Sequence, residues 1–238
     1  MILGIYGFQD SGKTTTVELL VKALSSKGYK VASVKHTPHY KSIDAEGKDT
    51  WRHWKAGSDP VVFSSVTETA IIKHSETPID DIVRIVTLEY HPDVVVVEGI
   101  KEGSFPKVAI GNLKPTKNTV MRNPSLQQIV KYVETEVAVE KVIEKLPGLN
   151  CGKCGVDCEG LARAIVEGEM KLSDCVELAS IDVEVFVGHD KIPMGRFASG
   201  IVNDTIRGML SSLKGYKSGL DVEIRLHASR TKPRGRKL

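Results

Sequence analysis

Residues 7–14 read Gly-Phe-Gln-Asp-Ser-Gly-Lys-Thr, which is the G-x-x-x-x-G-K-[ST] pattern of a Walker A loop, or P-loop. Gly7 and Gly12 permit the tight backbone of such a loop, because they carry no Cβ atom. The N–H groups of the loop, together with the N-terminus of a following helix, form a concave site for anions. Lys13 can reach the terminal phosphates, and the Thr14 hydroxyl can bind Mg²⁺. The stretch therefore predicts a site for a nucleoside triphosphate.

The residues on either side of the loop agree with this interpretation. Residues 1–6 form a short apolar run that predicts a buried parallel strand. After the loop, apolar residues recur at helical spacing, namely Val17, Leu20, Val21 and Leu24. Lys27 and Gly28 are typical of a helix end with a glycine cap. A glycine turn that matches the pattern by chance is the alternative, and the order strand, loop, helix argues against it.

The composition excludes several classes of protein. The chain has 238 residues, of which 41% are hydrophobic, and this suffices for one or two domains with a sizeable core. Aromatic residues make up only 5%, which argues against binding of single-stranded nucleic acid by base stacking. No segment approaches the roughly 18 apolar residues of a membrane span, and the N-terminus does not resemble a signal peptide. We therefore expect a cytoplasmic protein without membrane or nucleic-acid partners.

Charge is concentrated at the C-terminus. The net charge is +3, and residues 230–238 hold five Lys or Arg residues, so that the remaining chain carries −2. A solvated tail is the simpler interpretation of this segment. A contact with an acidic partner or with nucleic acid is the alternative.

Apolar strands and helices alternate up to residue 146. Strands are predicted at residues 30–34, 60–63, 70–73, 93–98 and 107–111, and helices at residues 48–56, from 78 onward, and at 125–146 with a candidate break near Thr135. This alternation predicts an α/β fold of the P-loop NTPase type, with a mostly parallel sheet and helices on both faces.

A second region follows the turn residues Pro147-Gly-Leu-Asn150. Its predicted elements are a helix at 159–167, a strand at 183–187, a turn at 188–191, a helix at 199–213 and a strand at 221–226. We expect four parts: a nucleotide-binding domain (1–146), a small iron–sulfur segment (147–178), a small α+β unit (179–229) and a basic tail (230–238).

Residues 94–99, Val-Val-Val-Val-Glu-Gly, resemble a Walker B strand. A carboxylate on Glu98, at the end of a buried strand, can hold Mg²⁺ beside Thr14, and Gly99 lets the chain turn close to the phosphates. An ordinary Glu at the end of a strand is the alternative, and the P-loop upstream favours the functional interpretation.

Further polar residues are weaker candidates for the same site. Lys35 and His36 follow a predicted strand, at the edge where open α/β sheets bind ligands. Asp49 and Arg52 share a helix face and either approach Mg²⁺ or form an exposed ion pair. The full predicted set is Gly7, Asp10, Ser11, Gly12, Lys13, Thr14, Thr15, Lys35, His36, Asp49, Arg52, Glu98, Gly99 and Lys101, with Lys13 and Asp10 as catalytic candidates and Thr14 and Glu98 as magnesium ligands. The choice between GTP and ATP does not follow from these residues.

The motifs in this order resemble the molybdopterin-guanine dinucleotide biosynthesis protein B (MobB) family. They are the P-loop, Lys35-His36, residues 47–53 with Ala56-Gly57, and residues 97–101 through Pro106-Lys107. The resemblance covers roughly residues 1–145, and it departs at Ile100, where the family usually has an aromatic residue.

The resemblance implies a GTP-binding P-loop protein with weak GTPase activity, usually dimeric, that assists the enzyme attaching GMP to molybdopterin. It matches Lys13 and Thr14 to the phosphate and Mg²⁺ residues and Glu98 to the Walker B acid. The family motifs also cover Lys35, His36, Asp49 and Arg52.

Four cysteines, Cys151, Cys154, Cys158 and Cys175, are separated by two, three and sixteen residues. In a reducing cytoplasm this grouping favours metal binding over disulfides. Three thiolates on one loop and a fourth beyond a helix can hold a [4Fe–4S] cubane, whereas a zinc ribbon more naturally has two C-x2-C pairs. The spacing therefore favours [4Fe–4S] over zinc, with unligated thiols as a third alternative.

Residues 146–155, with Ala162, Ala164 and Gly168, also resemble the four-cysteine iron–sulfur domain of corrinoid and redox proteins. That family usually has four residues between the second and third cysteines, whereas three stand here, which leaves zinc open.

Three functions are compatible with these features. The first is a GTP-binding accessory factor in molybdenum or tungsten cofactor maturation, working as a homodimer with molybdopterin guanylyltransferase and molybdoenzyme-maturation partners. The second is a redox-responsive nucleotide-binding scaffold. The third is a small-molecule kinase in which Lys35 and His36 serve the phosphoryl acceptor.

Overall fold

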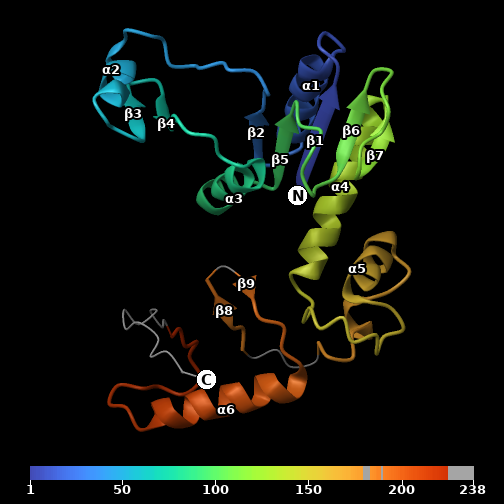
Figure 1. The fold of residues 1–238 in the computed structure, drawn as a ribbon. Helices are drawn as coiled ribbons and strands as arrows, with labels where there is room; N and C mark the ends of the chain where they lie inside the picture. Colours follow the sequence, from blue (N-terminus) through green and yellow to red (C-terminus); the bar gives the residue numbers. More distant parts are fainter. Residues whose placement is uncertain (179–182, 189, 225–238) are drawn as a thin grey trace, which may run out of the picture. The chain divides into compact units, whose positions relative to one another are not determined.

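The structure is a computed structural model that describes residues 1–178, 183–188 and 190–224 (Figure 1). It divides into two units, one made of residues 1–145 and 162–169, the other of residues 146–161 and the described residues from 170 onward. Within the described ranges, no helix combines the length and apolar character needed to cross a membrane.

The first unit is built on a five-stranded parallel sheet in the order β2-β5-β1-β6-β7 (Figure 1). Its strands are β1 (Ile2–Gly7), β2 (Val31–Lys35), β5 (Val94–Glu98), β6 (Lys107–Ile110) and β7 (Thr119–Arg122). β1 pairs in parallel with β5 on one side and with β6 on the other. The segment that follows β1 therefore leaves the sheet at the centre of its carboxyl edge, the position that a P-loop requires.

Helices cover both faces of this sheet. On one face, α1 (Lys13–Ser26) and α4 (Leu126–Ile143) pack against Val94, Val96 and other strand residues. On the other face, α3 (Ile79–Tyr90) packs Val83 against Val95 and Val97. Alternate residues of β5 point to opposite faces, so all of its side chains are buried. The predicted α/β fold with helices on both faces is confirmed.

The prediction of a break in the last helix of this unit was wrong. α4 runs without interruption from Leu126 to Ile143. Its N-terminus has a capping box, in which Ser125 and Gln128 satisfy each other's backbone N–H groups. Val130, Val133 and Val137 then give a continuous buried stripe. Packing of this stripe outweighs the weak helix propensity of Thr135.

The sequence analysis missed β7, and it did not predict how the strands at 60–73 pair. β7 lies at the edge of the sheet and alternates half-buried with exposed residues, so it lacks an apolar run. β3 (Val61–Ser64) and β4 (Thr69–Ile72) form an antiparallel hairpin of their own instead of joining the parallel sheet. α2 (Asp49–Lys55) packs against β3.

The second unit contains the cysteine segment and the described residues that follow it. Its elements include the start of α5 (Cys158–Glu167), the short 3-10 helix η1 (Leu172–Asp174), the hairpin of β8 (Phe186–Val187) and β9 (Asp190–Lys191), and α6 (Arg196–Ser211). The predicted strand at 183–187 is thus limited to its last two residues, and Asp190–Lys191 belong to a strand and not to the turn.

The C-terminal predictions are only partly covered by the structure. Residues 221–224 form no strand, contrary to prediction, and residues 225–226 and the basic tail at 230–238 lie outside the described residues.

A buried lysine at the start of β6 joins the segments that precede β6 and β7. Lys107 is 1% exposed, and its Nζ donates to the carbonyl oxygens of Gly103 at 2.7 Å, Phe105 at 3.2 Å and Lys117 at 3.2 Å. Burial lowers the pKa of Lys107, and the three carbonyls supply the polar surroundings that a buried ammonium needs. Lys107 therefore fixes the loop after Glu98 and does not face a ligand.

We expect Lys107→Met to lower the free energy of unfolding by about 1–3 kcal/mol, because three buried carbonyl groups lose their donor. Urea denaturation followed by circular dichroism measures this change. Lys131→Met, at an exposed position of α4, is the matched control and should stay within about 0.5 kcal/mol of the wild type. Equal stability of the two variants would contradict the bracing role of Lys107.

Candidate functional site

The P-loop connects the central strand β1 to the N-terminus of α1. A Cβ atom on Gly7 would lie 2.3 Å from the Ile110 carbonyl oxygen and 2.5 Å from Ser11 Oγ, so that only glycine fits. Gly12 has a φ of +88°, and α1 begins at the next residue, Lys13. The loop thus has the tight turn and the helix N-terminus that form an anion site.

Glu98, at the end of β5, is the centre of the polar contacts beside this loop. Thr14 Oγ1 donates a hydrogen bond to Glu98 Oε1 at 2.8 Å, and Lys35 Nζ donates to the same oxygen. Lys35 is the register partner of Glu98 on the neighbouring strand β2. The structure therefore brings together three of the predicted site residues from three different elements.

The electrostatic surroundings keep Glu98 ionised. Its side chain is almost fully buried, and burial alone would raise its pKa. The hydrogen bonds from Lys35 and Thr14 and the charges of Lys35 and Lys13 outweigh burial, so the net effect is a lowered pKa. Glu98 is thus a carboxylate at neutral pH and a suitable hard-oxygen ligand for Mg²⁺.

The backbone crosses closely where Gly99 meets the end of β2. Gly99 has a φ of +91°, and a Cβ atom there would lie 2.4 Å from the carbonyl oxygen of His36. His36 N donates to Glu98 O at 2.8 Å, and Gly99 N donates to Ile5 O at 2.9 Å. These bonds hold Lys35-His36 and Glu98-Gly99 at the same edge of the sheet as the P-loop.

The other predicted site residues lie in the P-loop, in the first turn of α1, or, in the case of Lys101, in the segment after β5. Lys13 Nζ donates to the Phe8 carbonyl oxygen, and Lys101 Nζ lies 5.7 Å from the centre of the Phe8 ring. Ser11 Oγ is buried and has no hydrogen-bond partner among the residues that the structure describes. Asp10 and Thr15 are exposed.

The structure does not bring Asp49 and Arg52 to this site. Both lie on α2, where Arg52 Nη1 is 3.8 Å from Asp49 Oδ1 in an exposed ion pair. Among the described residues, neither side chain has a hydrogen bond or ion pair to the P-loop. The arrangement is the exposed ion pair that the sequence left open as the alternative.

A buried polar cluster beside α2 was missed by the sequence analysis. Asp44 accepts a hydrogen bond from Thr50 at 2.6 Å, and its other oxygen lies 3.1 Å from Nε2 of His74. The His74 ring stacks on Trp54 with 4.1 Å between ring centres. These residues are distant in sequence and match no motif, so no local pattern could have found them.

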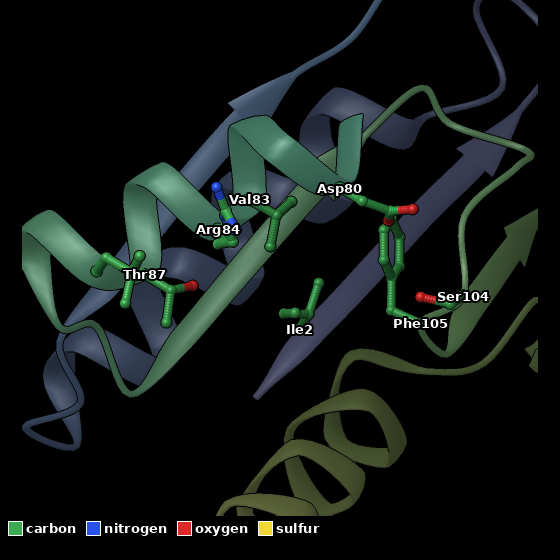
Figure 2. A pocket seen from close by; sticks show the side chains of 8 residues that line it. Ile2, Asp80, Val83, Arg84, Thr87, Ser104 and Phe105 are labelled. Carbon is green, nitrogen blue, oxygen red and sulfur yellow. The ribbon is translucent and has the colours of Figure 1, made fainter. Parts of the chain in front are cut away.

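An open cavity of about 440 Å³ lies beside α3 (Figure 2). Ile2, Val83 and Phe105 give it apolar walls, and Asp80 and Arg84 are polar residues on its lining. Ile2 stands at the amino end of β1, whereas the P-loop leaves its carboxyl end. None of the predicted nucleotide-site residues lines this cavity.

The four cysteines are all free thiols, with Cys175 buried and Cys151 exposed. Burial raises the pKa of the Cys175 thiol, and the charges of Cys154 and Cys158 raise it further. Backbone hydrogen bonds from Glu177 and Leu178 act in the opposite direction, and the net pKa is raised. Cys154 and Cys158 are therefore both near enough to Cys175 to influence it electrostatically.

Cys158 is held from both sides by Asn150. Asn150 N donates to Cys158 Sγ at 3.4 Å, and Cys158 N donates to Asn150 Oδ1 at 3.1 Å. As placed, no three His, Cys, Asp or Glu side chains of residues 1–178, 183–188 and 190–224 are grouped closely enough to hold a metal ion. The donor set itself, four thiols on one short segment, fits an iron–sulfur cluster.

A family model for molybdopterin guanine dinucleotide synthesis protein B (MobB) matches residues 2–134. The chain belongs to the MobB family. A second family model, described as "Putative Fe-S cluster", matches residues 146–177. The MobB match contains the P-loop, Lys35-His36 and Glu98-Gly99, and the second match contains all four cysteines.

Named relatives agree with this assignment. A Methanocaldococcus jannaschii protein, named "Putative molybdopterin-guanine dinucleotide biosynthesis adapter protein", is 29% identical over 97% of this chain and 99% of its own length. The Haemophilus influenzae molybdopterin-guanine dinucleotide biosynthesis adapter protein is 34% identical over 58% of this chain and 76% of its own length. The crystal structure of Bacillus subtilis MobB covers 57% of this chain and 96% of its own, at 22% identity and a TM-score of 0.46.

The lowered pKa of Glu98 predicts how the free energy of unfolding changes at acidic pH. A carboxyl group whose pKa is lower in the folded state stabilises the fold above the ordinary value of 4.5, and this contribution is lost as the pH falls through the lowered value. We expect the free energy of unfolding of Glu98→Gln to fall less between pH 6 and pH 3 than that of the wild type, as measured by urea denaturation. Glu102→Gln, at an exposed position, should keep the wild-type pH dependence.

Proposed function

We propose that this chain is a GTP-binding accessory protein of molybdopterin guanine dinucleotide biosynthesis, with weak Mg²⁺-dependent GTPase activity. Membership of the MobB family and the names of two relatives as adapter proteins support the pathway. The observation that carries the nucleotide site is the convergence of Thr14 and Lys35 on the buried carboxylate of Glu98, beside the P-loop.

Each residue of the site has a defined task in this proposal. The loop N–H groups and Lys13 bind the phosphates, and Thr14 and Glu98 provide oxygen ligands for Mg²⁺. The Lys35 ammonium partners Glu98, and it would be free to contact phosphate if Glu98 held Mg²⁺. Asp10 is the one carboxylate among residues 7–14, it is exposed, and in this proposal it is the candidate to position the attacking water.

An exposed apolar surface is relevant to the partners that this proposal includes. Val62, Phe63 and Ile71 of the β3–β4 hairpin are 41–67% exposed, an apolar surface that supports the proposed homodimer. The partner enzyme in this proposal is the molybdopterin guanylyltransferase, with molybdoenzyme-maturation proteins as further partners. A small-molecule kinase, in which Lys35 and His36 would serve the phosphoryl acceptor, stays an alternative hypothesis.

The second family match supports a cluster on the cysteine segment. Cys151, Cys154, Cys158 and Cys175 would hold it, and a [4Fe–4S] cluster would supply one-electron redox chemistry. Zinc on the same four thiols is the alternative, and a redox-responsive nucleotide-binding scaffold is the alternative function that such a cluster would permit.

Lys13→Ala tests the nucleotide site. We expect its affinity for Mg²⁺–GTP to fall at least tenfold, about 1.4 kcal/mol, because the ammonium that meets the terminal phosphates is gone. Isothermal titration calorimetry with GTP, ATP, GDP and GMP, each with and without Mg²⁺, measures the loss and the base preference together. Lys22→Ala, on the exposed part of α1, serves as the control. A wild-type chain that binds none of these nucleotides would end the proposal.

Anaerobic purification tests the cysteine segment. We expect a coloured protein that contains iron and acid-labile sulfide, and a Cys154→Ser variant that has lost most of both. Visible absorbance and the iron, sulfide and zinc contents of the same samples are the measurements. A colourless, zinc-loaded wild type would exclude every redox role.

A further inference from the structure

The cysteine segment is held together by a carboxylate that belongs to none of its motifs. Glu177 Oε1 accepts a hydrogen bond from Lys153 Nζ at 2.5 Å, in an ion pair, and Glu177 Oε2 accepts one from Arg196 N at 3.1 Å. The Glu177 side chain is only 13% exposed. Both of its oxygens are therefore engaged, each with a different stretch of the second unit.

Both residues of the Lys153–Glu177 ion pair lie close in sequence to the cysteines. Lys153 lies between Cys151 and Cys154, and Glu177 lies two residues after Cys175. The Lys153–Glu177 bond thus closes a loop between residues 24 apart in sequence, which contains α5 and η1. Without this bond, bringing the fourth cysteine to the other three would carry the whole entropic cost of closing that loop.

The second oxygen of Glu177 binds the start of α6. The N-cap residue of α6 is Gly195, which has no side chain that could cap the helix. The Glu177 carboxylate takes this role by accepting from Arg196 N, and negative charge is favourable at a helix N-terminus. A Cβ atom on Gly195 would lie 3.2 Å from Glu177 Oε2, so glycine leaves the room that this contact needs.

We propose that Glu177 is a positioning residue of the cysteine site. It ties the Cys151–Cys154 turn to the segment of Cys175 and to the N-terminus of α6, so that less chain has to be ordered when the four thiols come together around the metal group. The inference rests on the proposed iron–sulfur cluster, and it adds a residue outside the four ligands that governs how firmly the cluster is retained.

The test uses the full chain with its cluster assembled under anaerobic conditions. Lys153→Met and Glu177→Gln each remove the ion pair, and Glu177→Gln retains an oxygen that can still accept from Arg196 N. We expect both variants to lose iron to a chelator at least tenfold faster than the wild type, followed by the decay of visible absorbance. The double variant should lose iron no faster than the single variants, because all three remove the same interaction.

Three controls separate positioning from general damage. Glu184→Gln breaks an ion pair with Lys191 elsewhere in the second unit and should release iron at the wild-type rate. The electron paramagnetic resonance spectrum of the reduced cluster should be unchanged in Lys153→Met and Glu177→Gln, because the four thiolate ligands remain. The urea midpoint of the metal-free variants should stay near that of the metal-free wild type.

The outcomes distinguish this inference from the proposed function. A wild type that holds a cluster, with both variants retaining iron equally well, overturns the positioning role and leaves the cluster in place. A wild type that takes up zinc and no iron overturns the iron–sulfur proposal and with it the inference. Faster iron loss in Glu184→Gln as well would overturn it too, because any weakened ion pair would then have the same effect.

Discussion

The carboxyl edge of the sheet in the first unit depends on one buried, charged side chain. Glu98 is buried at the end of β5, an interior strand whose other four residues are all valine. A carboxylate in that position is costly unless it is paired and hydrogen-bonded. Thr14 from α1 and Lys35 from β2 meet this requirement. The need to satisfy one charge therefore fixes the relative placement of three elements around the P-loop.

The same charge gives the site two alternative partners. The Lys35 side chain is 62% exposed although its ammonium contacts Glu98, so it can leave the carboxylate without disturbing the core. Thr14 already stands at 2.8 Å from Glu98, with its oxygen placed beside the carboxylate. Exchange of the ammonium for a divalent cation would preserve neutralisation of the buried charge while freeing Lys35. In the proposed nucleotide site, the charge balance around Glu98 would therefore follow the binding of Mg²⁺ with its nucleotide.

What the sequence predicted, and what it did not, follows from how far apart the interacting residues lie. The P-loop and the Glu98-Gly99 strand end are continuous patterns, and the alternation of strands and helices is equally local, so both were predicted. Three other features of the fold depend on partners that no local pattern identifies. They are the burial of the Lys107 side chain, the pairing of β3 with β4, and the contact of Asp44 with His74. The roles assigned to the nucleotide-site residues stay predictions.

The cysteine segment shows how local geometry can accommodate an unusual spacing. With only three residues between Cys154 and Cys158, Cys158 becomes the first residue of α5. Asn150 N donates to the Cys158 sulfur, and Cys158 N donates in return to Asn150 Oδ1. The helix start and the two contacts with Asn150 therefore fix the third cysteine despite the shortened spacing. The four thiols are donors that a cluster or zinc can use, and a metal site also requires that Cys175 be brought to the other three.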